Sequence, residues 1–134
     1  MTDQTRPTAA DTAPARGPLT GIRVIELADE QAEYCGLTLA GLGAAVIKVE
    51  PPGGSPTRRI GPFYQDVIDP ERSLFFWQYN RGKRSIVLDL HQRNDRERFH
   101  SLVGTADILV ESTPRGELDA AGLGIQGLLK EFPP

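Results

Sequence analysis

Cysteine is nearly absent from this chain, and so is any long apolar run. Its 134 residues include one cysteine, Cys35, which excludes an internal disulfide and fits a reducing compartment. No run approaches the roughly 18 apolar residues that a membrane-spanning helix needs. The N-terminus also lacks the basic and then apolar pattern of a secretion signal. We therefore expect a cytoplasmic protein that does not use a membrane as partner.

An excess of positive charge is missing as well. The formal net charge is −3, so no basic field favours a nucleic-acid partner. Hydrophobic residues make up 39% of the chain and charged residues 25%, as is ordinary for a globular protein. The length allows one domain with a modest core. These values predict a globular protein without a nucleic-acid partner.

The common hydrolase and metal motifs are absent too. Neither G-x-S-x-G nor H-E-x-x-H occurs in the sequence. His91 and His100 lie in a polar segment with no cysteine or carboxylate at metal-ligand spacing, so we expect exposed histidines and no metal site. Cys35 lies in a segment rich in Ala and Leu, with no base placed beside it, and is interpreted as a small core residue.

Residues 19–50 carry the strongest structural pattern. Apolar, β-rich runs at residues 22–27 and 45–49 flank a segment, residues 32–42, whose apolar side chains recur at helical spacing. This pattern predicts a β-α-β unit with parallel strands, ending its helix at a glycine cap. Ligands of open α/β sheets bind at the carboxyl ends of the strands, which directs attention to the turn at residues 28–32.

That turn lacks the glycines of a dinucleotide site. G-x-G-x-x-G is absent, and Asp29, Glu30 and Glu33 would repel a phosphate there. Glu50 does end the second strand, where a ribose-binding acid would stand. Without the glycines, this position alone does not support an NAD or FAD site.

The rest of the chain follows the same alternation. Residues 1–18 are rich in Thr, Ala and Pro and predict a disordered tail. Residues 51–70 predict a long irregular segment. Further strands are expected at residues 86–90 and 106–110, and helices at residues 70–79, 91–103, 118–123 and 126–132. The chain then ends on Pro133-Pro134 where another strand is due, so we expect residues 19–134 to be the N-terminal part of a longer α/β domain.

Two segments allow more than one interpretation. The aromatic cluster at residues 74–79 is interpreted as a plug for the core or a subunit interface, with a ligand wall as the alternative. The basic turn containing Arg81, Lys83 and Arg84 could meet phosphates or carboxylates. Alternatively, these cations pair with nearby acids such as Glu71 or Asp89.

A set of ordered blocks covers the chain from Pro18 to its end. They are Pro18-Leu19-x-Gly21-Ile22-Arg23-Val24, Leu39-Ala40-x-Leu42-Gly43-Ala44-x-Val46-Ile47-Lys48-Val49-Glu50-Pro51-Pro52-Gly53-Gly54, Ser73-Leu74-Phe75-Phe76, Asn80-Arg81-Gly82-Lys83-Arg84-Ser85-Ile86-x-Leu88-Asp89-Leu90, Ala106-Asp107-Ile108-Leu109-Val110-Glu111, Gly116-x-Leu118-Asp119 and Gly122-Leu123-Gly124. Together these blocks resemble the family III CoA-transferases, typified by carnitine and bile-acid CoA-transferases and formyl-CoA transferase.

The resemblance implies a Rossmann-like open, mainly parallel sheet with flanking helices, incomplete in this segment. Family members form interlocked dimers, so a homodimer is expected for the full-length protein. They move coenzyme A between carboxylic acids through an aspartyl-CoA thioester. No aspartate of this chain matches the family's nucleophile. The implied partners are an acyl-CoA and a carboxylic acid as substrates, with no tightly bound cofactor.

The resemblance also implies which residues meet coenzyme A. Gln31 matches a position that lines the acyl site, where its amide would support catalysis by hydrogen bonding to a carboxylate or thioester oxygen. Leu88 matches a position in the adenine pocket. The remaining expected contacts are Glu30, Ala32, Glu111, Ser112, Thr113 and Arg115.

Three departures from the family pattern bear on these roles. Glu33-Tyr34 replaces a frequent Gly-Pro, and residues 111–116 read ESTPRG instead of ENFRPG. Ala120 replaces an arginine that meets the phosphates, so either Arg115 supplies this charge or CoA binding is weak. Two other functions stay open at this point: an acyl-CoA racemase of the same family, and a non-catalytic half-domain of a transferase.

Overall fold

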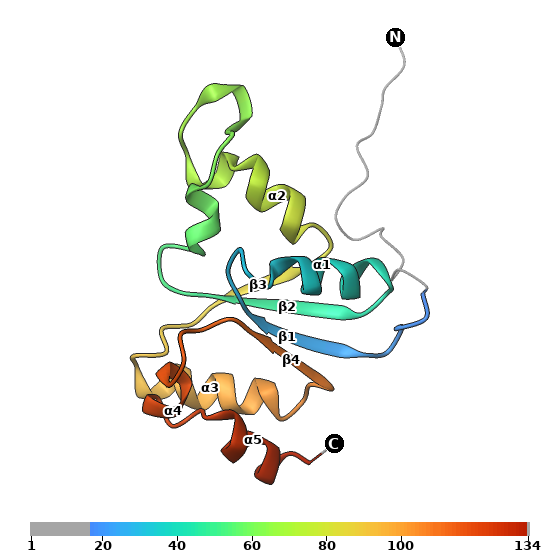
Figure 1. Ribbon diagram of the computed structural model, residues 1–134, viewed down its shortest axis with the longest axis vertical. Helices are drawn as coiled ribbons and strands as arrows, with labels where there is room; N and C mark the ends of the chain where they lie inside the picture. Colours follow the sequence, from blue (N-terminus) through green and yellow to red (C-terminus); the bar gives the residue numbers. More distant parts are fainter. Residues whose placement is uncertain (1–16, 134) are drawn as a thin grey trace.

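The computed structural model describes residues 17–133, and within them the strands form one open parallel sheet (Figure 1). The predicted β-α-β unit and both later strands are confirmed. The third strand lies nearer the N-terminus than residues 86–90: it ends at Val87, and the Leu88 backbone N–H makes one further hydrogen bond to the carbonyl oxygen of Glu50 at 3.0 Å. The strands are β1 (Arg23–Leu27), β2 (Ala45–Glu50), β3 (Arg84–Val87) and β4 (Ile108–Glu111), in the order β3-β2-β1-β4.

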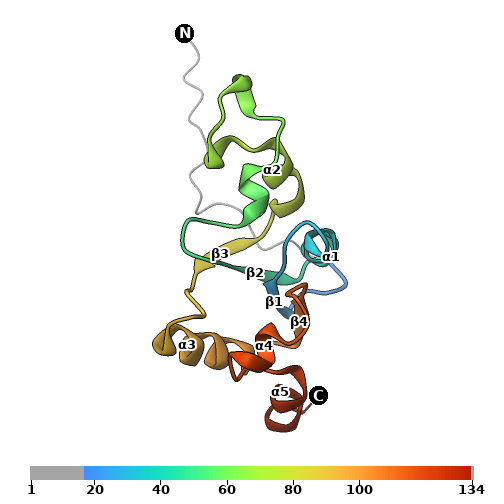
Figure 2. The same ribbon diagram turned by 60° about the vertical axis from the view of Figure 1, so that its left-hand side comes forward.

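Helices cover both faces of this sheet (Figures 1 and 2). One face carries α1 (Glu33–Gly41) and, further out, α2 (Leu74–Asn80), whereas the other carries α3 (Arg93–Val103), α4 (Glu117–Ala120) and α5 (Ile125–Glu131). Gly43 follows α1 with a φ of 99°, which confirms the predicted glycine cap. No helix within residues 17–133 is long and apolar enough to cross a membrane. The predicted tail lies outside the described residues, apart from Gly17 and Pro18.

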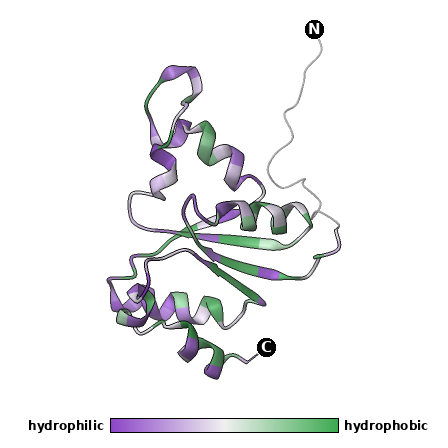
Figure 3. Ribbon diagram, viewed as in Figure 1, coloured by the Kyte–Doolittle hydropathy of each residue, from purple (hydrophilic) through white to green (hydrophobic). Residues whose placement is uncertain are grey.

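Each face of the sheet has its own apolar core, because side chains alternate along a strand. Hydrophobic residues follow the strands in Figure 3. On the α1 side, Val24, Ala44 and Val46 are buried together. The larger cluster, on the side of α3, α4 and α5, consists of Ile25, Val49, Leu88, Phe99, Val103, Leu118, Leu123 and Leu128.

Two expected core positions are in fact exposed. Cys35 is exposed because Glu33, Gly36 and Leu37 form the buried face of α1, and Cys35 does not share that face. The aromatic helix α2 also lies outside both cores, with Trp77 45% exposed. The core interpretation of these two segments is therefore wrong, whereas a role of α2 in a subunit interface stays a prediction.

The segment between β2 and α2 extends away from the sheet (Figure 2). It contains three 3₁₀ helices, η1 (Pro56–Arg59), η2 (Tyr64–Asp66) and η3 (Pro70–Arg72). Two of its side chains, Tyr64 and Arg58, pack on aromatic rings of α2. The ring centroids of Tyr64 and Trp77 are 5.7 Å apart, and the guanidinium of Arg58 lies 3.8 Å from the ring centre of Phe76. These two contacts hold the segment against α2.

Candidate functional site

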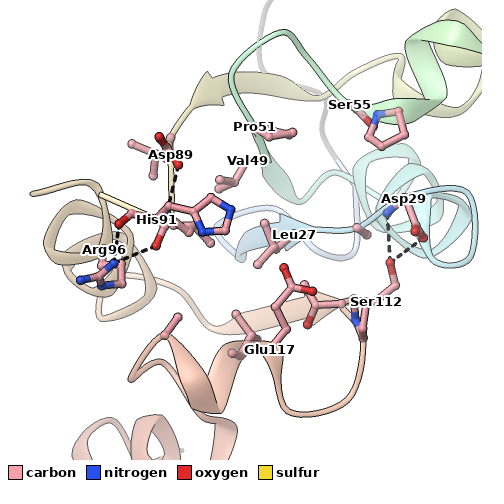
Figure 4. Close-up of a pocket in the computed structure, with 18 of the residues that line it drawn as sticks. Leu27, Asp29, Val49, Pro51, Ser55, Asp89, His91, Arg96, Ser112 and Glu117 are labelled. Atoms are coloured by element: carbon pink, nitrogen blue, oxygen red, sulfur yellow. Dashed lines mark hydrogen bonds between the residues drawn. The ribbon is translucent and has the colours of Figure 1, made fainter. Parts of the chain in front are cut away.

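A pocket of about 500 Å³ lies at the carboxyl ends of the strands (Figure 4). Segments that follow every strand contribute to it, as the sheet-edge rule predicts. Helix α4 and the start of α3 close its other side. The lining residues are Leu27, Ala28, Asp29, Val49, Pro51, Pro52, Ser55, Pro56, Leu88, Asp89, Leu90, His91, Arg96, Ser112, Thr113, Pro114, Glu117, Leu118, Ala120 and Ala121.

The floor of the pocket is apolar and its rim is polar. Leu27 and Val49 stand at the ends of β1 and β2 and point toward its centre in Figure 4, as does the imidazole of His91. Carboxylates of Asp29 and Glu117 lie on the rim. An apolar group of a ligand therefore fits inside, with hydrogen-bonding groups around its edge.

One rim contact ties the first turn to the end of β4. The Ser112 hydroxyl donates to Oδ1 of Asp29 at 2.7 Å, and the Asp29 backbone N–H donates to the same hydroxyl oxygen at 3.0 Å. The Gln31 backbone N–H also donates to Oδ1 of Asp29, at 3.1 Å. Asp29 therefore orders the turn, and its carboxylate is not simply a free charge at the helix start.

The opposite rim is ordered by Arg96 of α3. Its guanidinium donates to the carbonyl oxygens of Leu90 and His91 at 3.1 and 2.9 Å. The His91 backbone N–H donates to Oδ1 of Asp89 at 3.0 Å. The imidazole of His91 has no hydrogen-bond partner within residues 17–133 and remains available to a ligand.

The structure brings together only some of the site residues predicted from the sequence. Leu88, Ser112 and Thr113 line the pocket. Glu30 and Gln31 lie beside it on the exposed part of the turn, and Ala32 is half-buried there. Glu111 and Arg115 border a neighbouring hollow of about 300 Å³ instead.

Sequence reasoning named Leu88 but missed other residues that follow β2 and β3. Pro51, Asp89 and His91 line the pocket, yet the sequence analysis places them in an irregular segment, in the third strand and on exposed surface, respectively. His91 is exposed, as expected. His100 is half-buried instead, because its imidazole Nε2 lies 2.9 Å from Oε2 of Glu131. The strand-end rule, when it is applied to every strand, identifies the missing residues.

A cluster of buried charges lies beneath the first turn, on the α1 side of the sheet. Glu26, Glu33 and Lys48 are each at most 1% exposed. The Lys48 ammonium lies 3.2 Å from Oε1 of Glu26 and 2.7 Å from Oε1 of Glu33. Glu33 is therefore paired inside the protein and does not oppose a bound phosphate, contrary to the expectation from the sequence.

Lys83 completes this cluster from the basic turn before β3. Its ammonium donates to Oε2 of Glu26 at 2.8 Å and to Oδ1 of Asn80 at 3.0 Å. Burial lowers the pKa of Lys83 from its ordinary value, although the hydrogen bond to Glu26 opposes that change. The proposed pairing with Glu71 or Asp89 is wrong for Lys83, because its partner comes from a strand far away in the sequence.

Glu50 is likewise a structural residue and not a free ribose-binding acid. Burial by itself raises the pKa of its carboxyl, but hydrogen bonds from Arg58, Ser85 and the Ser55 backbone outweigh this and lower the pKa from 4.5 to about 2. The Arg58 Nε lies 2.6 Å from Oε2 of Glu50. The carboxylate is thus ionised, and its oxygens already accept hydrogen bonds from other residues of the chain. Among the described residues, no group of three or more His, Cys, Asp or Glu could hold a metal ion.

Comparisons with known proteins agree with this architecture. The chain is 41% identical over 109 residues to the succinyl-CoA:(R)-benzylsuccinate CoA-transferase subunit BbsE of Thauera aromatica, covering 81% of the chain and 27% of the relative. It is 42% identical over 127 residues to the acetyl-CoA:oxalate CoA-transferase of Acetobacter aceti, covering 92% of the chain and 31% of the relative.

The solved structures give the same result. The crystal structure of a CAIB/BAIF family protein from Brucella suis matches with a TM-score of 0.78 and 40% identity, covering 87% of the chain and 31% of that protein. The chain therefore spans about 30% of the length of the relatives it matches. The family model for CoA-transferase family III matches residues 19–134. The chain belongs to CoA-transferase family III.

Proposed function

We propose that this chain is the coenzyme A-binding, N-terminal segment of an enzyme that moves coenzyme A between carboxylic acids. The observation that carries this proposal is the apolar pocket at the strand ends, in a chain of this family. Transfer through an aspartyl-CoA thioester would require a nucleophilic aspartate from the remainder of the protein. The named transferases among the relatives favour transfer over racemisation.

The shape and charge of the pocket suggest which part of coenzyme A it receives. Its floor of Leu27, Val49 and Leu88 suits the flat adenine ring. The carboxylates of Asp29 and Glu117 suit ribose hydroxyl donors and disfavour phosphates at the same place. The phosphates would therefore lie outside, within reach of exposed cations.

The first turn would then face the reacting end of the substrate. Glu30 and Gln31 lie on the solvent side of this turn, and the amide of Gln31 has no hydrogen-bond partner within residues 17–133. An amide placed there donates to a developing thioester or carboxylate oxygen. In the full-length enzyme, Gln31→Ala should lower turnover more than it weakens binding of the CoA thioester.

Calorimetric titration of coenzyme A into the chain tests the pocket assignment. Ala120 is exposed and lines the pocket, so the bulky side chain in Ala120→Trp should fill the space without disturbing the core. Ala45, at the amino end of β2, is exposed at the opposite edge, and Ala45→Trp serves as the matched control. We expect at least about a tenfold loss of affinity in the first variant only, a difference of about 1.4 kcal/mol. Equal affinities in both variants would reject this pocket as the site.

A further inference from the structure

Two buried lysines hold the two ends of the turn that carries Gln31. The ammonium of Lys48 donates to the carbonyl oxygen of Ala28 at 2.6 Å, where β1 has just ended. The ammonium of Lys83 donates to the carbonyl oxygen of Glu33 at 2.9 Å, where α1 begins. Both ends of the turn are therefore attached to cations that come from other elements, one from β2 and one from the segment before β3.

The carboxylate of Glu26 lies between these lysines and fixes them relative to each other. It accepts from Lys48 at 3.2 Å and from Lys83 at 2.9 Å, both at Oε1. Gly36 of α1 makes room for this carboxylate, because a Cβ at that position would overlap Oε2 of Glu26. Two carboxylates and two ammonium groups balance in charge, so the cluster is neutral as a whole.

Stability alone is a poor explanation for this cluster. Buried ion pairs are often no more stabilising than apolar residues of similar size, because both charges lose their hydration. Burial also lowers the pKa of Lys83, which reflects that cost. In addition, Oε2 of Glu33 is buried without a hydrogen-bond partner within the described residues. A cluster that leaves such an atom unsatisfied is not optimised for stability.

We propose that Lys48, Lys83 and Glu26 are positioning residues that set the place of the Gln31 turn relative to the pocket. This inference rests on the proposed function, in which Gln31 acts at the reacting thioester. The lysines do not touch the substrate. They act through the backbone, by holding the carbonyl oxygens of Ala28 and Glu33 at fixed points beneath the turn. A displacement of a catalytic group by about 1 Å is enough to slow an enzyme severely.

Hydrogen exchange in the chain itself tests the positioning without any activity. The variant Lys83→Met removes the bond to Glu33, and Glu26→Gln/Lys83→Met removes the same bond while leaving the neutral pair of Lys48 and Glu33. Leu128→Ala, at a buried residue of α5 that lines neither pocket, is the control for general destabilisation. Amide exchange at residues 29–33 should accelerate about tenfold or more in the lysine variants relative to this control. Equal amide exchange rates at residues 29–33 in the Lys83 variants and in Leu128→Ala would overturn the proposal.

Kinetics of the full-length enzyme give the second test. The double variant Glu26→Gln/Lys83→Met should lower kcat by about tenfold or more while leaving KM for the CoA thioester within about twofold of the wild-type value. When the double variant is combined with Gln31→Ala, the total loss of kcat should be much smaller than the product of the two separate losses. The reason is that displacing the turn can no longer harm catalysis once the Gln31 amide has been removed. Leu128→Ala is the control, and its effect on kcat should multiply with that of Gln31→Ala. If the effect of the double variant multiplies with that of Gln31→Ala in the same way, the proposal is overturned. A wild-type enzyme without transfer activity would reject the proposed function instead, and the exchange experiment would still decide the positioning.

Discussion

Single residues in this chain show how burial and pairing compete. Glu50 is 1% exposed, and burial alone would favour its neutral form. Three hydrogen-bond donors, from Arg58, Ser85 and the Ser55 backbone, reverse this preference. The same carboxylate therefore joins β2, β3 and the start of η1. Its ionisation state should be visible as a pH dependence of stability.

We expect the stability that Glu50 contributes to disappear in acid. The folded-state pKa of about 2 lies below the ordinary value of 4.5, so the contribution is complete above about pH 4.5 and is lost as the pH falls toward 2. A shift of this size corresponds to at most about 3 kcal/mol. Urea unfolding of the wild type and of Glu50→Gln between these pH values measures the difference.

The exposed ion pair of Glu97 and Arg93 provides the control for this experiment. Both side chains are more than half exposed, at 62% and 84%, so Glu97→Gln should change stability by at most about 0.5 kcal/mol at any pH. Parallel stability curves for wild type and Glu50→Gln would show that the paired carboxylate does not produce this pH dependence.

Arg115 is the second residue with a specific expectation. It is exposed, borders the hollow next to the pocket, and has no side-chain hydrogen bond within residues 17–133. If it supplies the phosphate contact missing at Ala120, Arg115→Ala should weaken coenzyme A binding by about 1.5–3 kcal/mol. Calorimetric titration measures this loss, with the exposed Lys130→Ala on α5 as control. A change below about 0.5 kcal/mol would mean that Arg115 is merely solvated.

At the scale of elements, α1 combines a crowded glycine with an open one. Gly36 faces the carboxylate of Glu26, which Lys48 and Lys83 hold in place, whereas Gly41 has open space beside its Cα. Gly36→Ala should therefore lower the free energy of unfolding by about 1–3 kcal/mol through overpacking. Gly41→Ala should raise it by about 0.5–1 kcal/mol, because alanine is the better helix former. Thermal or urea unfolding compares them, and equal effects would contradict the packing found beneath α1.

The elements themselves could largely be predicted from the sequence, whereas their buried charges could not. Apolar periodicity identifies β1, α1 and β2, because these patterns are local. The partner of Lys83 is Glu26, separated from it by 57 residues, and only the sheet topology brings the two together. The prediction that Cys35 lies in the core fails for a different reason. In a helix rich in Ala and Leu, the two faces differ too little in hydrophobicity for the sequence to show which one is buried.

The lining of the candidate pocket could be predicted only in part. Ser112 and Thr113 follow β4 and line the pocket, as the strand-end rule indicates. His91 was missed because a polar helix start gives no local sign that it borders a cavity. Gln31 was assigned by resemblance alone, and its role remains a prediction.

At the scale of the whole molecule, exposed large apolar side chains are concentrated in the lobe formed by residues 60–80. Ile68 is 85% exposed, Tyr64 46% and Trp77 45%, while Phe75 and Phe76 are half-buried. A concentration of such side chains on one lobe is typical of an interaction surface.

We expect this chain to self-associate through that lobe when it is studied alone. Burying a large apolar side chain contributes about 1.5–3 kcal/mol, so introducing a charge at the most exposed position should weaken association strongly. Sedimentation velocity over a range of concentrations should therefore show a lower average mass for Ile68→Asp than for the wild type. Leu129→Asp, on α5 at a residue that is 50% exposed, is the matched control and should sediment like the wild type. A wild-type chain that remains a monomer at every concentration would contradict this expectation, because the apolar lobe would then be tolerated in water without a partner.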